Sequence, residues 1–269
     1  MPRAETVTPE LLRDWPLPGV DDDGDKLDRG SIHVVGGADS TPGAVLLAGL
    51  AALRVGAGRL TITTVQETAA ALGVAVPEAM VIGAPGVKGS LGSCTVDEVP
   101  EAFVVGPGIL TPGKLVRSVL KHGEAAALVV DAVALHDLPR TLPDRTVLTP
   151  NGRELLSLAG RRRPSDEAAL AQHVSDRYSA VVVSQDWVAA PDGRLWHSPT
   201  GSAVLGTSGS GDVLAGVVGG LLARGADPAQ AACWGQYLHA AAGERHGRLG
   251  MLARELLDEL PAVLADLTT

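Results

Sequence analysis

The chain has 269 residues, 45% of them hydrophobic, which is enough for one α/β domain or two small ones with a sizeable core. Its 22 basic and 31 acidic residues give a net charge of −9, which argues against nucleic acid or an anionic membrane as the main partner. The segment from Met1 to Trp15 is charged, and no uninterrupted apolar run reaches about 18 residues, so we expect a cytoplasmic protein without a membrane partner.

Helical and extended patterns alternate along the chain. A short helix begins at Thr8-Pro9-Glu10, where a capping residue precedes a proline and an acid, and an acidic linker follows at 21–25. We therefore separate residues 1–25, an N-terminal helix with its linker, from one domain at 26–269. The apolar patterns then predict strands at 32–35, 60–65, 102–105, 126–131, 147–148, 181–183 and 187–190, and helices at 43–55, 112–120, from about 151, 212–223, 228–246 and 251–264.

Apolar strands that alternate with helices are typical of an α/β fold with a mostly parallel sheet covered on both faces. In such sheets ligands bind at the carboxyl ends of the strands. The loops after the strands are therefore the places to look for chemistry.

The most informative loop runs from Thr207 into the helix expected at Asp212. Small residues at 209–211 let backbone N–H groups approach a ligand, and the start of a helix offers unpaired donors and a positive dipole end. A carboxylate beside a bound phosphate is repelled unless it binds Mg²⁺ or accepts a proton from the attacking group, which makes Asp212 a candidate base. The loop predicts a phosphoryl-transfer site, and a plain capped helix is the alternative.

Three further loops follow predicted strands. The glycines at 36–43 and 106–108 allow the backbone to approach a ligand, and flexible connections or tight turns explain them as well. Asn151 and Glu154 lie three residues apart at the start of a helix, so they share one face and can hold Mg²⁺-bound water. A capping-box variant, with Asn151 as the N-cap, is the other interpretation.

Motifs of this kind recur in a fixed order over about residues 26–247. They are Lys26-Leu27-Asp28-Arg29-Gly30, Val34-Val35-Gly36-Gly37, Pro42-Gly43-Ala44, Arg54-Val55-Gly56-Ala57-Gly58, Gly106-Pro107-Gly108, Val130-Asp131-Ala132, Leu148-Thr149-Pro150, Pro191-Asp192-Gly193, Gly209-Ser210-Gly211-Asp212-Val213-Leu214-Ala215-Gly216 and Tyr237-Leu238-His239. This series resembles the ADP-dependent NAD(P)H-hydrate dehydratases of the ribokinase-like superfamily.

The resemblance implies a single-domain, ribokinase-like three-layer sandwich that restores NADH or NADPH from the S-form of its hydrate, NADHX or NADPHX. ADP or ATP is the co-substrate, ADP being cleaved to AMP and phosphate, and Mg²⁺ is the cofactor. A homo-oligomer such as a tetramer is expected, with the alanine-rich late helices as one contact. The residues implied are Asp212 as the catalytic base; Ala44, Gly108, Asn151 and Asp212 for the hydrate; Gly209, Ser210, Gly211, Ser184 and Gln185 for the nucleotide; and Glu154 for the metal.

The chain departs from the family pattern at three places. Asn151, Gly152 and Arg153 stand where the family usually has His-Pro-Gly before the glutamate, and Val133 replaces a second acid. The loop at 184–187 is short and lacks the family's lysine, so Arg153 either pairs with phosphate or is an exposed arginine. A small-alcohol kinase of the hydroxyethylthiazole type and a non-catalytic nucleotide-binding relative remain alternatives.

Overall fold

Strand β2 (Ser31–Val35) shows how the local sequence builds the centre of the molecule. Ile32 and Val34 are buried in the apolar cluster on one face of the sheet, whereas Val35 is buried in the cluster on the other face. This alternation arises because successive side chains of a strand point to opposite faces. Strand β2 therefore lies inside the sheet, with a parallel neighbour on each side.

The computed structural model describes residues 4–19, 29–123, 126–161, 163–199 and 203–268. The other strands are β1 (Glu5–Thr6), β3 (Arg59–Val65), β4 (Ala79–Ala84), β5 (Gly86–Val87), β6 (Ser90–Leu91), β7 (Ala102–Val105), β8 (Ala127–Val130), β9 (Thr146–Leu148), β10 (Val181–Ser184), β11 (Trp187–Ala189) and β12 (Leu195–His197).

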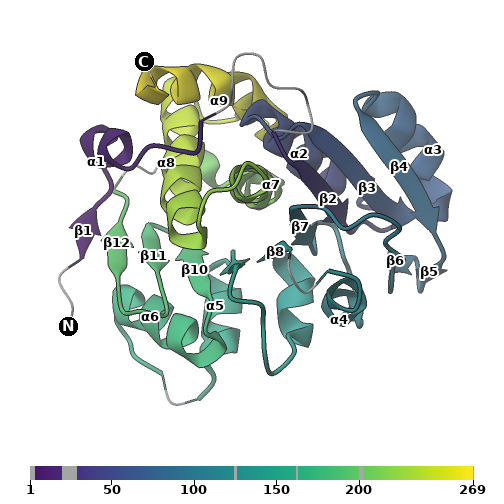
Figure 1. Ribbon diagram of the computed structural model, residues 1–269, viewed down its shortest axis with the longest axis horizontal. Coiled ribbons are helices and arrows are strands. Elements are labelled where there is room, and N and C mark those ends of the chain that lie inside the picture. Colours follow the sequence, from purple (N-terminus) through teal and green to yellow (C-terminus); the bar gives the residue numbers. More distant parts are fainter. Residues whose placement is uncertain (1–3, 20–28, 124–125, 162, 200–202, 269) are drawn as a thin grey trace.

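Within the described residues the main sheet has ten strands in the order β1-β12-β11-β10-β9-β8-β7-β2-β3-β4 (Figure 1). Only the pairs β10/β11 and β11/β12 in this sheet are antiparallel. The prediction of a mostly parallel sheet is confirmed.

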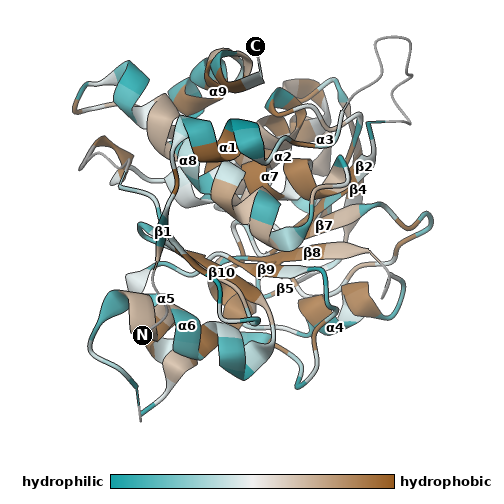
Figure 2. Cartoon of the chain, turned by 60° about the vertical axis from the view of Figure 1, so that its left-hand side comes forward, coloured by the Kyte–Doolittle hydropathy of each residue, from teal (hydrophilic) through white to brown (hydrophobic). Residues whose placement is uncertain are grey.

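Helices cover both faces of the sheet (Figure 2). One layer consists of α1 (Pro9–Asp14), α2 (Pro42–Arg54), α3 (Gln66–Ala75), α7 (Ser210–Ala223), α8 (Pro228–His246) and α9 (Ala253–Thr268). The other consists of α4 (Leu115–Leu120), α5 (Gly152–Ala159), α6 (Glu167–Tyr178) and the 3₁₀ helix η1 (Ala132–Asp137), and a second 3₁₀ turn, η2 (Ala203–Leu205), precedes α7. The three-layer α/β sandwich is therefore as predicted.

Helices α2 and α7 pack side by side, and this packing sets the position of the α7 N-terminus. A Cβ atom at Gly216 would lie 2.1 Å from the carbonyl oxygen of Ala48, and one at Gly220 would lie 2.7 Å from that of Ala52. Four residues further along α7, the contact is also four residues further along α2. The two helices are therefore parallel, and their N-termini lie at the same end. Glycine at these positions allows the two backbones to come this close.

Residues 4–19 are part of the same packed unit. Strand β1 pairs with β12, and α1 begins as predicted at Thr8, whose hydroxyl accepts a hydrogen bond from the Leu11 N–H at 3.2 Å. The side chains of Gln230 and Trp234 donate to the Trp15 carbonyl at 3.1 and 2.9 Å. The linker expected at 21–25 lies outside the described residues, so the boundary after residue 25 stays a prediction.

The structure adds elements to those predicted from the sequence. Helices α3 and α6 and strands β1 and β4 were not expected from the apolar pattern. The helix predicted at 112–120 begins only at Leu115, because Pro112 and Gly113 are the residue types least suited to a helix interior. No helix in the described ranges is long and apolar enough to cross a membrane.

Candidate active site

A cleft of about 710 Å³ opens where the loops after β8, β9 and β10 meet the N-terminus of α7. This is the edge where parallel sheets bind ligands, because the carboxyl ends of the strands diverge there. The predicted site residues that line it are Asn151, Glu154, Gln185, Gly209, Ser210, Gly211 and Asp212. Among the described residues of its wall there is no lysine or arginine, so backbone donors are needed for any anion bound here.

The N-terminus of α7 has the geometry of an anion site. Gly209 has a φ of 92°, a left-handed conformation that favours glycine, and helix α7 begins at the next residue. Ser210 N donates to the Thr207 carbonyl oxygen at 3.3 Å, so the N–H groups of Gly211 and Asp212 are the ones at the edge of the cleft without a backbone partner among the described residues. Gly211 is exposed, and a Cβ there would meet no atom within 4 Å, so a ligand can reach its backbone.

Asp212 lies in the first turn of α7 and lines the cleft. Burial raises the pKa of its carboxyl to about 6. At pH 7 the group is still mostly ionised, yet it holds a proton more firmly than an ordinary aspartate does. Asp212 is therefore suited to accept a proton from a hydroxyl bound in the cleft.

His239 on α8 supports the start of α7. Its Nε2 lies 2.8 Å from the hydroxyl of Ser210 and 3.0 Å from the Ser210 carbonyl oxygen. Burial lowers the pKa of His239 to about 4, so the imidazole is neutral at pH 7 and adds no positive charge to the cleft. A packing role is therefore favoured over a subunit contact, because most of α8, including His239, is buried within the chain.

Asp131 follows β8 and lines the floor of the same cleft. Its Oδ1 accepts a hydrogen bond of 2.9 Å from the hydroxyl of Thr149, which follows β9. Burial, and after it the negative charge of Asp212, raise the pKa of Asp131 to about 8. The carboxyl is consequently mostly protonated at neutral pH. The sequence pointed to Asp131 only as part of a motif, although its place directly after a buried parallel strand was a usable signal.

Asn151 and Glu154 form the capping box that their spacing allows. The Asn151 side chain accepts hydrogen bonds from the N–H groups of Arg153 and Glu154 at 2.9 and 3.1 Å, and Glu154 Oε2 accepts one from Asn151 N at 2.8 Å. Both residues also line the cleft. The box fixes the Glu154 carboxylate at the cleft wall, so it does not exclude the predicted metal role.

The donor set fits Mg²⁺ only as part of a nucleotide complex. No group of three or more His, Cys, Asp or Glu side chains in the described ranges can hold a metal ion. Mg²⁺ commonly takes one or two carboxylates and completes its shell with phosphate oxygens and water. Glu154 can supply such a carboxylate from the cleft wall.

The turn between β10 and β11 contributes Gln185 and Asp186 to the cleft, whereas Ser184 is not among the lining residues. The Ser184 side chain is buried, and strand alternation places it on the face of Val182, away from Val183, which lines the cleft. Gln236 on α8 also lines the cleft, and its Nε2 donates to the Gln185 carbonyl. Gln236 was missed because buried residues surround it on every side of α8, so periodicity gives it no distinct face.

Ala44 and Gly108 lie together outside this cleft wall. A Cβ at Gly108 would lie 3.0 Å from that of Ala44, and the Thr41 hydroxyl donates to the Gly108 carbonyl at 2.7 Å. A Cβ at Gly209 would lie 2.6 Å from Cδ1 of Leu47, one turn after Ala44 on α2. The predicted hydrate residues therefore adjoin the α7 loop through α2. Arg153 is exposed and does not line the cleft.

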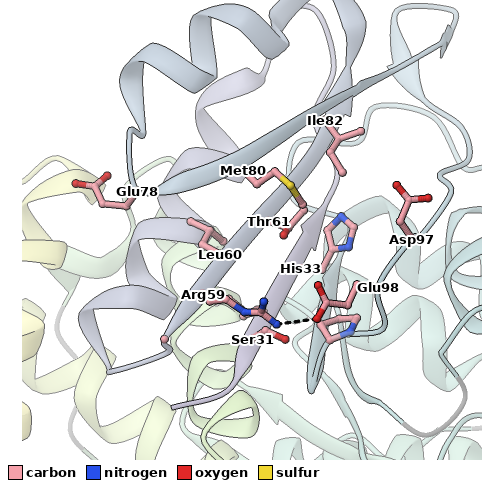
Figure 3. A pocket seen from close by; sticks show the side chains of 13 residues that line it. Ser31, His33, Arg59, Leu60, Thr61, Glu78, Met80, Ile82, Asp97 and Glu98 are labelled. Carbon is pink, nitrogen blue, oxygen red and sulfur yellow. Dashed lines mark hydrogen bonds and ion pairs between the residues drawn. The ribbon is translucent and has the colours of Figure 1, made fainter. Parts of the chain in front are cut away.

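A second hollow, of about 480 Å³, opens beside the amino-terminal parts of β2 and β3 (Figure 3). Arg59 Nη2 donates a hydrogen bond of 3.0 Å to Glu98 Oε1 there. His33 Nε2 lies 2.7 Å from the Thr63 hydroxyl. Burial lowers the pKa of His33 to about 4, so this imidazole is neutral at pH 7. The hollow lacks the open helix N-terminus of the first cleft.

The chain is similar to known proteins over most of its length. A family model described as NAD(P)H-hydrate dehydratase matches residues 32–262. The ADP-dependent (S)-NAD(P)H-hydrate dehydratase of Xanthomonas campestris pv. campestris is 41% identical over 283 residues, which cover 98% of this chain and 97% of that one. The enzyme of the same name from Bacillus subtilis is 33% identical over 262 residues, covering 92% and 93% of the two chains.

The fold has a solved counterpart. The crystal structure of ADP/ATP-dependent NAD(P)H-hydrate dehydratase from Bacillus subtilis, co-crystallised with ATP and Mg²⁺, superposes with a TM-score of 0.85 at 31% identity. The match covers 99% of this chain and 100% of that one. By sequence and by fold, this chain belongs to the NAD(P)H-hydrate dehydratase family.

Proposed function

We propose that this protein restores NADH and NADPH from the S-forms of NADHX and NADPHX by an ADP-dependent dehydration that releases AMP and phosphate. ATP is the alternative co-substrate. The observation that carries the proposal is the cleft itself, in which the partly buried carboxyl of Asp212 adjoins the open N-terminus of α7. The proposal is also supported by the family to which the chain belongs, because its members are named as NAD(P)H-hydrate dehydratases.

In this mechanism Asp212 accepts the proton of the ring hydroxyl as its oxygen attacks the terminal phosphoryl group of ADP. The P–O bond to AMP breaks, and the backbone N–H groups of Gly209 and Gly211 stabilise the charge on the transferred group, whereas the Ser210 N–H donates to the Thr207 carbonyl. Phosphate then leaves from the ring carbon, driven by the lone pair of the ring nitrogen, and loss of a ring proton completes the reduced nicotinamide. The sum is hydrate plus ADP to give NAD(P)H, AMP and phosphate.

The remaining roles follow from position. Glu154 would hold Mg²⁺, and the bound ion would neutralise negative charge on the phosphates. Asn151, which lines the cleft, would contact the hydrate, and Ala44 with Gly108 would bound it where α2 adjoins the α7 loop. Gln185 would contact the nucleotide, whereas Ser184, predicted beside it, does not line the cleft.

The test is direct. Purified protein is incubated with Mg²⁺, the S-form of NADPHX and either ADP or ATP, and the recovery of absorbance near 340 nm is followed together with the formation of AMP and phosphate. No recovery with either nucleotide would reject the proposal. An arm with hydroxyethylthiazole and ATP examines the small-alcohol kinase, and nucleotide binding without turnover in either arm would identify a non-catalytic relative.

Light scattering in solution examines the remaining expectation, that the protein is a homo-oligomer. Most of α8 is buried inside the chain, so this helix is not the free contact surface that its alanine content suggests.

A further inference from the structure

The cleft has two chemically different ends. At the α7 end it offers the backbone N–H donors of Gly209 and Gly211. At the other end the β10–β11 turn presents Asp186, whose side chain is exposed, lines the cleft and makes no hydrogen bond or ion pair with the described residues. A carboxylate accepts hydrogen bonds and repels phosphate, so this end does not suit the phosphates of a nucleotide.

Gln236 adds a second acceptor at the Asp186 end. Its side chain amide must turn Nε2 toward the Gln185 carbonyl, because a carbonyl oxygen only accepts hydrogen bonds. The orientation of the amide is thereby fixed, and Oε1 is left buried without a hydrogen-bond partner among the described residues. Gln236 is only 5% exposed. Buried polar atoms are almost always paired, and Gln236 lines the cleft, so we take a donor from the bound ligand as the partner of this acceptor.

Gln236 and His239, which both line the cleft, connect its two ends through α8. Gln236 precedes His239 by three residues on α8, which is a rise of about 4.5 Å along the helix. His239 contacts Ser210 at the start of α7. The Gln236 end and the α7 N-terminus are therefore adjoining parts of one cleft, as the ribose and the phosphates are adjoining parts of a nucleotide.

We propose that Asp186 and Gln236 form a ribose subsite, in which their side-chain oxygens accept hydrogen bonds from the hydroxyl groups of the adenine nucleotide. The proposal rests on the proposed function, since it takes an adenine nucleotide as the ligand. The β10–β11 turn, which stands where the family has its lysine-bearing loop, would then contact the nucleoside and not the phosphates.

Isothermal titration of the nucleotide-free protein in the presence of Mg²⁺ tests the subsite. The ligands are ADP, 2′-deoxy-ADP, 3′-deoxy-ADP and IDP, and the variants are Asp186→Ala and Gln236→Met. The control is Asp192→Ala, which removes the same charge from the β11–β12 turn outside the cleft, where Asp192 pairs with Arg194 at 2.8 Å. Thermal unfolding of each variant confirms that it is folded.

We expect wild-type protein to bind ADP at least tenfold more tightly than one of the two deoxy analogues. In Asp186→Ala, ADP should bind at least fivefold more weakly, while the dissociation constant of that analogue changes less than twofold. Gln236→Met should likewise bind ADP more weakly and distinguish it less well from the analogue. Asp192→Ala should retain wild-type values. Asp186 is exposed, so its variant remains decisive if Gln236→Met does not fold.

The sign of the Asp186 effect separates this role from simple electrostatics. Without a ribose contact, removal of a negative charge near an anionic ligand tightens binding. Tighter or unchanged binding of ADP to Asp186→Ala would overturn the proposal. So would a variant that loses only the preference for ADP over IDP, because the side chain would then contact the base and not the ribose. Wild-type protein that binds no adenine nucleotide would instead reject the proposed function.

Discussion

Gly216 on α7 lies directly against the backbone of Ala48 on α2, with room for a hydrogen atom but not for a side chain. A Cβ at this position would lie 2.1 Å from the Ala48 carbonyl oxygen. The contact connects the helix that carries Asp212 with the helix that begins beside Ala44. Packing of the α7 glycines against the α2 backbone thus fixes how the two sides of the active site face each other.

Replacement of Gly216 by alanine should therefore force α7 away from α2. We expect a loss of about 1 to 3 kcal/mol in the free energy of unfolding, typical of an overpacked core, measured by urea denaturation. Gly211→Ala is the matched control, because a Cβ at Gly211 meets nothing within 4 Å. Equal stability of the two variants would show that α2 and α7 can separate freely.

Asp212→Asn should abolish turnover and leave the fold intact. The amide cannot accept the hydroxyl proton, so we expect the rate to fall by several orders of magnitude, while the dissociation constant for ADP changes far less. The absorbance assay and a nucleotide titration measure the two effects separately. A variant that keeps a tenth of the wild-type rate would show that Asp212 is not the base.

The pH dependence of the wild-type rate should report the same carboxyl. Since burial raises the pKa of Asp212 to about 6, the base is protonated below that pH and kcat/KM should fall about tenfold per pH unit there. Circular dichroism at each pH verifies that the protein remains folded. An acid limb centred near pH 4 would mean that the reactive group is an ordinary carboxylate.

Asp131→Asn should change the pH dependence of stability. The pKa of Asp131 is about 8 in the folded chain and near 3.9 in an unfolded one, so its contribution is fully present below about pH 4 and is lost as pH rises toward 8. Asparagine removes this loss and keeps an acceptor for Thr149. Between pH 5 and pH 8 we expect the variant to gain more than about 1 kcal/mol in unfolding free energy relative to wild type. Parallel curves for the two proteins would exclude a raised pKa.

The sequence predicts the central strands and the clustering of the loops because both depend on local patterns. Strands such as β2 and β7 are short apolar runs followed by glycine-containing loops, and parallel pairing brings their carboxyl ends to one edge. Asn151, Glu154 and Asp212 therefore come together in the cleft as expected. By contrast, α3 and α6 were not predicted, because their apolar residues do not form a clear stripe.

The contacts that the buried helix α8 makes with the site could not be predicted from the sequence. Gln236 and His239 lie on α8, where nearly every position is buried, so the pattern that usually separates a functional face from a packed one is absent. Ser184 was grouped with Gln185 from the sequence alone, and only strand alternation in the folded sheet separates the two.

Arg153→Ala tests whether the short loop without lysine needs a replacement cation. From the sequence, Arg153 is the nearest cation in the matching loops, and a guanidinium that pairs with phosphate would make its loss cost at least tenfold in affinity. In the structure Arg153 is exposed in the first turn of α5 and does not line the cleft, although its neighbours Gly152 and Glu154 do. We therefore expect the dissociation constants for ADP and for the hydrate to change less than about twofold. Titration of both ligands decides the matter, and a tenfold loss for either would mean that the arginine swings into the cleft when the ligand binds. Wild-type affinity would leave the backbone N–H groups of α7, together with Mg²⁺, as the groups that hold the phosphates.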